Sequence, residues 1–141
     1  MKEIKEIVDD IVDTYRTRDP HIIAKKYGIN IMYKEMGEIR GFFREIDGKS
    51  FIALNENLSE FMTKMVLAHE LGHYFLHKDH YDELIDIRDN FLGYASIMEK
   101  EANKFAAYLI IDKENLQNFD FEMEEEYEKK IFQNLSSLIL E

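Results

Sequence analysis

Residues 69–73 read His-Glu-Leu-Gly-His, and they directly follow the apolar run Met65-Val66-Leu67-Ala68. Residues four apart lie on the same face of an α-helix, about 6 Å apart along its axis. His69 and His73 can therefore bind one Zn²⁺ ion together, and Glu70 can take a proton from the water on that ion. This spacing predicts the metal-binding helix of a zinc metallopeptidase.

Two buried core histidines without a metal are the alternative. The flanks of the motif are strongly apolar, so the predicted helix buries it; they include Phe61, Met65, Val66, Ala68, Leu71, Tyr74, Phe75 and Leu76. Buried histidine and glutamate side chains need partners, and we favour a metal ion as that partner. Gly72 in mid-helix costs about 1 kcal/mol relative to alanine, which predicts a packing reason for it.

Length and composition narrow the class of protein. The 141 residues are predicted to form one domain, residues 1–141, around one core. No cysteine is present, which excludes thiolate ligands and disulfides, and the net charge of −11 disfavours direct nucleic-acid binding. The longest apolar run, Phe105–Ile111, has seven residues, too few to span a membrane, and the first residues lack a signal-peptide pattern. We therefore expect a cytoplasmic protein with no membrane partner.

The first 55 residues combine helical and strand patterns. Apolar residues at i, i+3 and i+4 predict an amphipathic helix over residues 2–17. Asp19-Pro20 predicts the N-cap and first residue of a short helix that ends at Gly28. Residues 29–35 alternate weakly and predict a strand. Asp47-Gly48-Lys49 predicts the turn of a hairpin between two segments rich in Phe and Ile, residues 39–46 and 50–55.

The remaining residues are predicted to be mainly helical. Asn57 or Ser59 starts the helix that carries the motif, and this helix runs to about His77. An irregular segment over 78–95 precedes a helix over 96–111, and residues 113–141 form a helical C-terminal tail. This order predicts an α+β architecture of the zincin-like kind, with a small, mainly antiparallel sheet and several packed helices.

A catalytic zinc ion usually has three protein ligands and a water. His77 lies about 12 Å of helical rise beyond His69, so it cannot share the metal and is interpreted as a helix-end residue. In the next helix Glu99 is the favoured third ligand. Asn103, four residues later, shares its face and can accept a hydrogen bond from a ligating histidine. Glu101, which points to a different side of this helix, remains the alternative ligand.

Four segments of the chain carry the pattern of one family. They are Ile39-Arg40-Gly41-Phe42-Phe43; Ile52-Ala53-Leu54-Asn55 with Asn57-Leu58-Ser59; Val66-Leu67-Ala68-His69-Glu70-Leu71-Gly72-His73-Tyr74-Phe75-Leu76-His77; and Glu99-Lys100-Glu101-Ala102-Asn103-Lys104-Phe105-Ala106-Ala107-Tyr108-Leu109. Over about residues 20–112 they resemble the ImmA/IrrE family of bacterial and phage metallopeptidases, which pairs HELGH with an E-x-x-A-N/D-x-F-A helix. The resemblance implies that Glu99 is the third zinc ligand and that Asn103 occupies the family's Asn/Asp position.

The resemblance further implies a regulatory protease, because relatives act on a helix-turn-helix repressor and relieve repression. The predicted cofactor is Zn²⁺, held by His69, His73 and Glu99 in a gluzincin-like set, and Glu70 is the predicted catalytic residue. The predicted partner is a protein substrate, a DNA-binding repressor. It could add as an extended strand at the sheet edge near residues 50–55.

A binding protein is the alternative function. In that case a metal-containing but non-proteolytic chain regulates a repressor or toxin partner by stoichiometric association. The tail gives some support, because it carries many apolar residues: Phe119, Phe121, Tyr127, Ile131, Phe132, Leu135, Leu138 and Ile139. We favour the interpretation that they close the core. The intact Glu70 favours the enzyme, because a structural zinc has no need of it.

Overall fold

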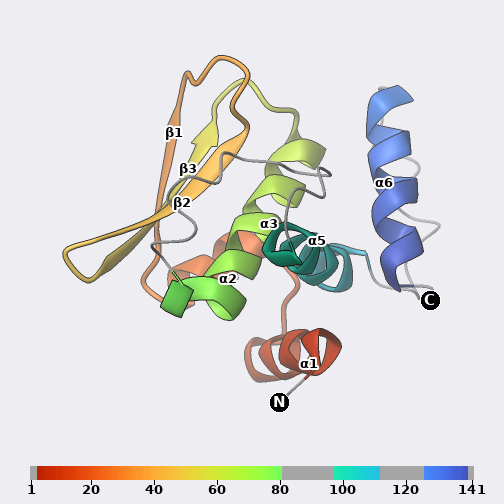
Figure 1. Cartoon of the computed structure of the whole chain (residues 1–141), viewed down its shortest axis with the longest axis horizontal. Helices are drawn as coiled ribbons and strands as arrows, with labels where there is room; N and C mark the ends of the chain where they lie inside the picture. Colours follow the sequence, from red (N-terminus) through yellow and green to blue (C-terminus); the bar gives the residue numbers. More distant parts are fainter. Residues whose placement is uncertain (1–2, 81–96, 112–125, 140–141) are drawn as a thin grey trace.

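A small sheet and the helices packed on it give the chain an α+β fold, in agreement with the prediction (Figure 1). This computed structural model describes residues 3–80, 97–111 and 126–139. The elements in chain order are α1 (Ile4–Tyr15), α2 (Pro20–Lys26), β1 (Asn30–Lys34), β2 (Gly41–Ile46), β3 (Lys49–Asn55), α3 (Glu60–His77), the short 3₁₀ helix η1 (Lys78–His80), α5 (Ile97–Ile110) and α6 (Glu126–Ile139). None of these helices is long and apolar enough to cross a bilayer.

The sheet has the order β1-β3-β2, with β3 in the centre. β3 is antiparallel to β2 but parallel to β1, so the sheet is mixed rather than mainly antiparallel. The reason is that the chain passes from β1 to the far edge before the hairpin returns β3 between them. Because β3 is paired on both sides, the prediction of a substrate strand beside residues 50–55 is wrong: among the residues that the structure describes, β1 and β2 form the edges of the sheet.

The hairpin and the helix starts follow local sequence signals. Asp47 and Gly48 have φ angles of 50° and 76°, and a two-residue type I′ turn requires positive φ at both positions. The Asp19 side chain accepts a hydrogen bond from the backbone N–H of His21 at 2.9 Å, and thereby caps α2 as predicted. For α3, Ser59 rather than Asn57 is the N-cap, because its Oγ accepts from the N–H of Met62 at 3.1 Å.

Helix α3 is the central element of the core. It packs on the sheet through β2 and β3, on α2, and on α5, while α5 also contacts α1 and α6 (Figure 1). Because neighbouring elements contact α3 on these sides, most of its residues are buried. The largest side chains with no exposed surface come from α3 and α5 in particular: Met65, Leu67, Leu71, Phe105 and Leu109.

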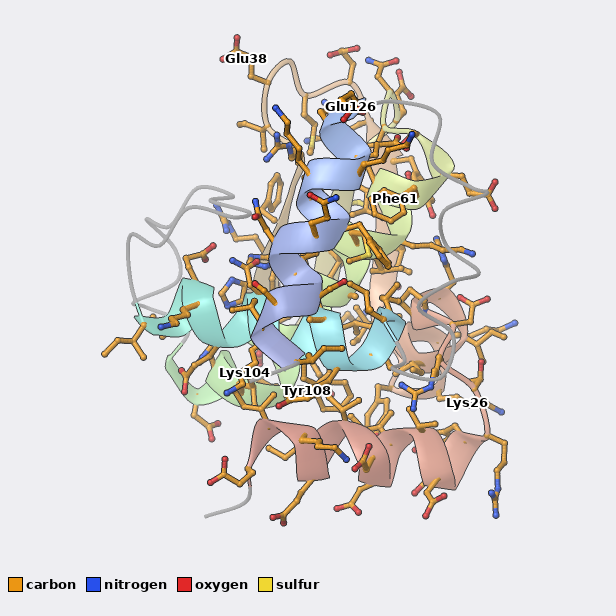
Figure 2. All side chains as sticks on the ribbon, turned by 90° about the vertical axis from the view of Figure 1, so that its right-hand side faces the viewer. Lys26, Glu38, Phe61, Lys104, Tyr108 and Glu126 are labelled. Carbon is orange, nitrogen blue, oxygen red and sulfur yellow. The ribbon has the colours of Figure 1, made fainter. Side chains whose placement is uncertain are left out.

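Helix α6 belongs to the same core. Its buried apolar residues pack into the common cluster, as predicted for the tail: Ile131, Phe132, Leu135, Leu138 and Ile139. Figure 2, viewed from the side of α6, shows this helix crossing α5, which it contacts. At its first turn the buried Glu128 accepts a hydrogen bond of 2.5 Å from Ser59 Oγ, and so joins α6 to the start of α3. Phe119 and Phe121 lie outside the described residues.

The burial of α6 gives a stability prediction. Leu135→Ala is expected to lower the free energy of unfolding by about 2–5 kcal/mol, because it removes a side chain with no exposed surface. Tyr127→Ala on the same helix is the control: Tyr127 is 48% exposed, and its replacement should cost no more than about 0.5 kcal/mol. Urea unfolding of both variants measures the difference. Equal, small effects would contradict a core role for α6.

Candidate metal centre

The two motif histidines come together because they lie one turn apart on α3. Their rings stand nearly perpendicular, with centroids 4.9 Å apart, and both side chains are buried. Each ring turns Nε2 toward the carboxylate of Glu99 on α5. His69 Nε2 lies 3.2 Å from Oε2, and His73 Nε2 lies 2.8 Å from Oε1. The sequence-predicted ligands His69, His73 and Glu99 therefore meet at one point in the core.

This donor set fits a divalent metal ion. One ligand atom from each of the three residues lies within 4.8 Å of the others, and in the described ranges they are the one group with this property. Ligand atoms at 2.0–2.1 Å from a tetrahedral ion lie about 3.4 Å from one another, close to the two nitrogen–oxygen distances observed. Two imidazole nitrogens and a carboxylate suit zinc, and they also suit Fe(II).

The protonation states of this cluster also suit a metal. Burial lowers the pKa of His73 to about 4, so its ring is neutral at pH 7. Burial raises the pKa of Glu99, but hydrogen bonds from His69 and His73 outweigh this effect and lower it to about 2. A neutral imidazole and an ionised carboxylate are the forms that bind metal ions.

Gly72 lets α5 approach α3 closely enough to deliver Glu99. A Cβ atom built on Gly72 would lie 3.0 Å from Ala102 Cα and 3.1 Å from Ala102 O. The two helix backbones therefore meet where a side chain on α3 would hold them apart. This contact is the packing reason that the sequence predicts for a mid-helix glycine. Ala102 lies between Glu99 and Asn103 in the sequence of α5, so the close contact falls in the part of α5 that carries both residues.

The sign of the change in the free energy of unfolding caused by Gly72→Ala tests this close approach. At an uncrowded helix position the change would stabilise the protein by about 1 kcal/mol. Here we expect a net loss of about 1–3 kcal/mol, because the added methyl group meets backbone atoms that cannot move independently of α5. Thermal unfolding of the metal-free protein measures the change. A higher unfolding temperature would contradict the tight contact.

Asn103 lies where the sequence places it. It is fully buried, and its Oδ1 is 2.8 Å from Nδ1 of His69. A histidine that binds a metal through Nε2 carries its proton on Nδ1, which can donate to this amide oxygen. Glu70 follows His69 on α3 and is 2% exposed. Both residues thus lie in the buried part of α3 and α5 that holds the candidate ligands.

The alternative ligand Glu101 does not join the cluster. Its Oε1 lies 3.0 Å from Nε2 of His77, and its side chain is 43% exposed. His77 itself is the last residue of α3, as predicted, but it is buried and its Nδ1 lies 2.9 Å from Nδ1 of His73. Sequence reasoning missed this contact. The signal for it was the continued spacing of four residues from His69 through His73 to His77.

An HExxH helix and a glutamate from a second buried helix, around one candidate metal site, are features of metallopeptidases. The model of a peptidase family described as the IrrE N-terminal-like domain matches residues 24–138, which include both helices. The chain therefore belongs to the ImmA/IrrE family of metallopeptidases.

Two curated relatives agree with this assignment. The chain is 31% identical over 109 residues to the uncharacterized immunity region protein 2 of Bacillus phage phi105. This match covers 77% of this chain and 68% of the phage protein. It is 35% identical over 79 residues to the metallopeptidase ImmA of Bacillus subtilis (strain 168), and this match covers 55% of this chain. The second match spans 46% of the length of ImmA.

Proposed function

We propose that this protein is a zinc-dependent peptidase that hydrolyses a peptide bond in a helix-turn-helix repressor and thereby relieves repression. The observation that carries the proposal is the buried cluster of His69, His73 and Glu99, with Glu70 beside it on α3. Family membership supports the peptidase activity. The repressor as substrate rests on the family resemblance and on the word "immunity" in the name of the phage relative.

In the proposed mechanism His69, His73 and Glu99 would hold Zn²⁺, in the manner of the gluzincins. The bound ion would lower the pKa of the attacking water and polarise the scissile carbonyl. Glu70 would serve as the general base that takes a proton from the attacking water and as the general acid that delivers it to the leaving amine. Asn103 keeps the ring of His69 in its Nδ1–H form, so that Nε2 remains directed toward the ion.

The sheet offers β2 as the edge for an extended substrate. Of the two edge strands, β2 packs on α3, the helix that carries the motif. The contact is tight at Gly41, where an added Cβ would lie 2.9 Å from Cγ1 of Val66, three residues before His69. A peptide strand that added to β2 would gain main-chain hydrogen bonds next to the metal-binding helix.

Stoichiometric binding without proteolysis is the alternative, and it loses part of its support. It rested on the apolar residues of the tail as a partner surface. Most of those on α6 are buried in the core instead, and Tyr127 alone among them is exposed, at 48%.

The test uses a purified helix-turn-helix repressor as the candidate substrate. The purified protein is stripped of metal with a chelator, reloaded with zinc, and incubated with the repressor before and after reloading. We expect cleavage only after reloading, into two fragments whose masses add up to the intact repressor plus one water. A repressor that binds the zinc-loaded protein but stays intact would contradict proteolysis and favour stoichiometric association.

A further inference from the structure

Two side chains outside the candidate ligand set connect His73 to the molecular surface. His73 Nδ1 contacts His77 Nδ1 at 2.9 Å, and His77 Nε2 contacts Glu101 Oε1 at 3.0 Å. His77 is buried at the end of α3, whereas the Glu101 side chain on α5 is 43% exposed. His73, His77 and Glu101 therefore form a row of contacting side chains. This row leads from the candidate metal centre to a carboxylate in contact with solvent.

Metal binding at His73 Nε2 would fix the direction of these hydrogen bonds, whereas without a metal ion Nε2–H can donate to Glu99 instead. His73 turns Nε2 toward Glu99, so a neutral, metal-binding His73 must carry its proton on Nδ1. This Nδ1–H donates to His77 Nδ1, which is then an acceptor and leaves the His77 proton on Nε2. That Nε2–H donates to the Glu101 carboxylate. Each contact thus pairs one donor with one acceptor.

We propose that His77 and Glu101 are positioning residues of the metal centre, which orient His73 as Asn103 orients His69. The inference rests on the proposed role of His73 as a ligand. Ligating histidines generally donate their second N–H to an acceptor that fixes the ring and raises its basicity. For His69 the acceptor is a buried amide, whereas for His73 it is a second histidine backed by a carboxylate. The contact between His77 and Glu101 also joins the end of α3 to α5, on which Glu99 lies.

Zinc affinity separates positioning of His73 from a purely structural link between helices. Competition with a chromogenic chelator gives the zinc dissociation constant of the full chain. His77→Phe keeps a ring of similar size but no acceptor, and we expect about 10–100-fold weaker binding. Glu101→Ala should weaken binding in the same direction. Glu101→Gln should weaken zinc binding by less than about tenfold, because the amide oxygen of the glutamine still accepts a hydrogen bond from His77 Nε2.

A matched control removes the same charge elsewhere. Glu38→Gln alters an exposed loop residue that Figure 2 shows at one extreme of the molecule, and its zinc affinity should equal that of the wild type. The unfolding temperature of each metal-free variant is measured in parallel. A structural link alone would lower this temperature and leave zinc affinity unchanged, which would overturn the inference. If His77→Phe does not fold, the half-exposed Glu101 variants still decide the question.

The tautomers offer a second readout that is independent of activity. In long-range ¹H–¹⁵N spectra of the zinc-loaded protein, His73 should be protonated on Nδ1 and His77 on Nε2. A His77 protonated on Nδ1 would overturn the inference, because it could not accept from His73. A wild type that binds no zinc would remove the proposed function and this inference together. Tight zinc binding that is indifferent to His77 and Glu101 would remove the inference alone.

Discussion

Glu70→Gln is expected to slow peptide cleavage by about 10²–10⁴-fold and to leave zinc binding unchanged. Glutamine has nearly the same shape as glutamate but cannot take a proton from the attacking water, and general base catalysis is worth about this factor. Glu70 is 2% exposed and is not one of the three clustered candidate ligands. Its replacement therefore does not directly alter the metal site or the charge on Glu99. The loss should therefore fall on kcat rather than on metal content.

Two measurements on the same preparation check this expectation. Elemental analysis should find about one zinc per chain in the wild type and in the variant, and quenched time courses with the repressor should give the rates. Glu60→Gln is the matched control, because Glu60 is an exposed residue in the first turn of the same helix. A zinc-loaded Glu70→Gln variant that cleaves at nearly the wild-type rate would refute the proposed role of Glu70.

Sequence signals predicted the parts of this fold that depend on a few neighbouring residues. Asp19 and Ser59 cap helices with their own side chains, and Asp47-Gly48 forms the tight turn of the hairpin. The placement of Glu99 was also predictable. Helical periodicity restricted the choice of face, and the resemblance to the family's second motif agreed with that choice.

Features that depend on contacts between distant segments were beyond such signals. The central place of β3 depends on its direct pairing with β1, although β2 lies between these two strands in the sequence. His77 shows the same limit at the site. The helical rise of about 12 Å argues against His77 as a ligand shared with His69. It does not exclude a contact with His73 one turn away, and the further contact of His77 with Glu101 comes from α5, a distant segment of the sequence.

Glu99→Ala is expected to weaken zinc binding several-hundred-fold, more than any change at His77 or Glu101. Zinc bound by four protein ligands contributes about 10–16 kcal/mol, so an equal share for one ligand is about 2.5–4 kcal/mol, which corresponds to an affinity loss of up to several-hundred-fold. The loss of the carboxylate also removes the only acidic member of the cluster of three. Chelator competition measures the affinity, and Lys100→Ala, at an exposed neighbouring position on α5, is the control that should bind like the wild type.

The order of the losses identifies the ligand. If Glu99 binds the metal and Glu101 acts through His77, Glu99→Ala must cost more affinity than Glu101→Ala. The reverse order would make Glu101 the ligand, in contradiction to the 3.2 and 2.8 Å approaches of the two histidine Nε2 atoms to Glu99. Equal and small losses would mean that the two histidines bind zinc without a carboxylate from α5. The close contact between Gly72 and Ala102 would then not serve to bring a metal ligand from α5 to the two histidines.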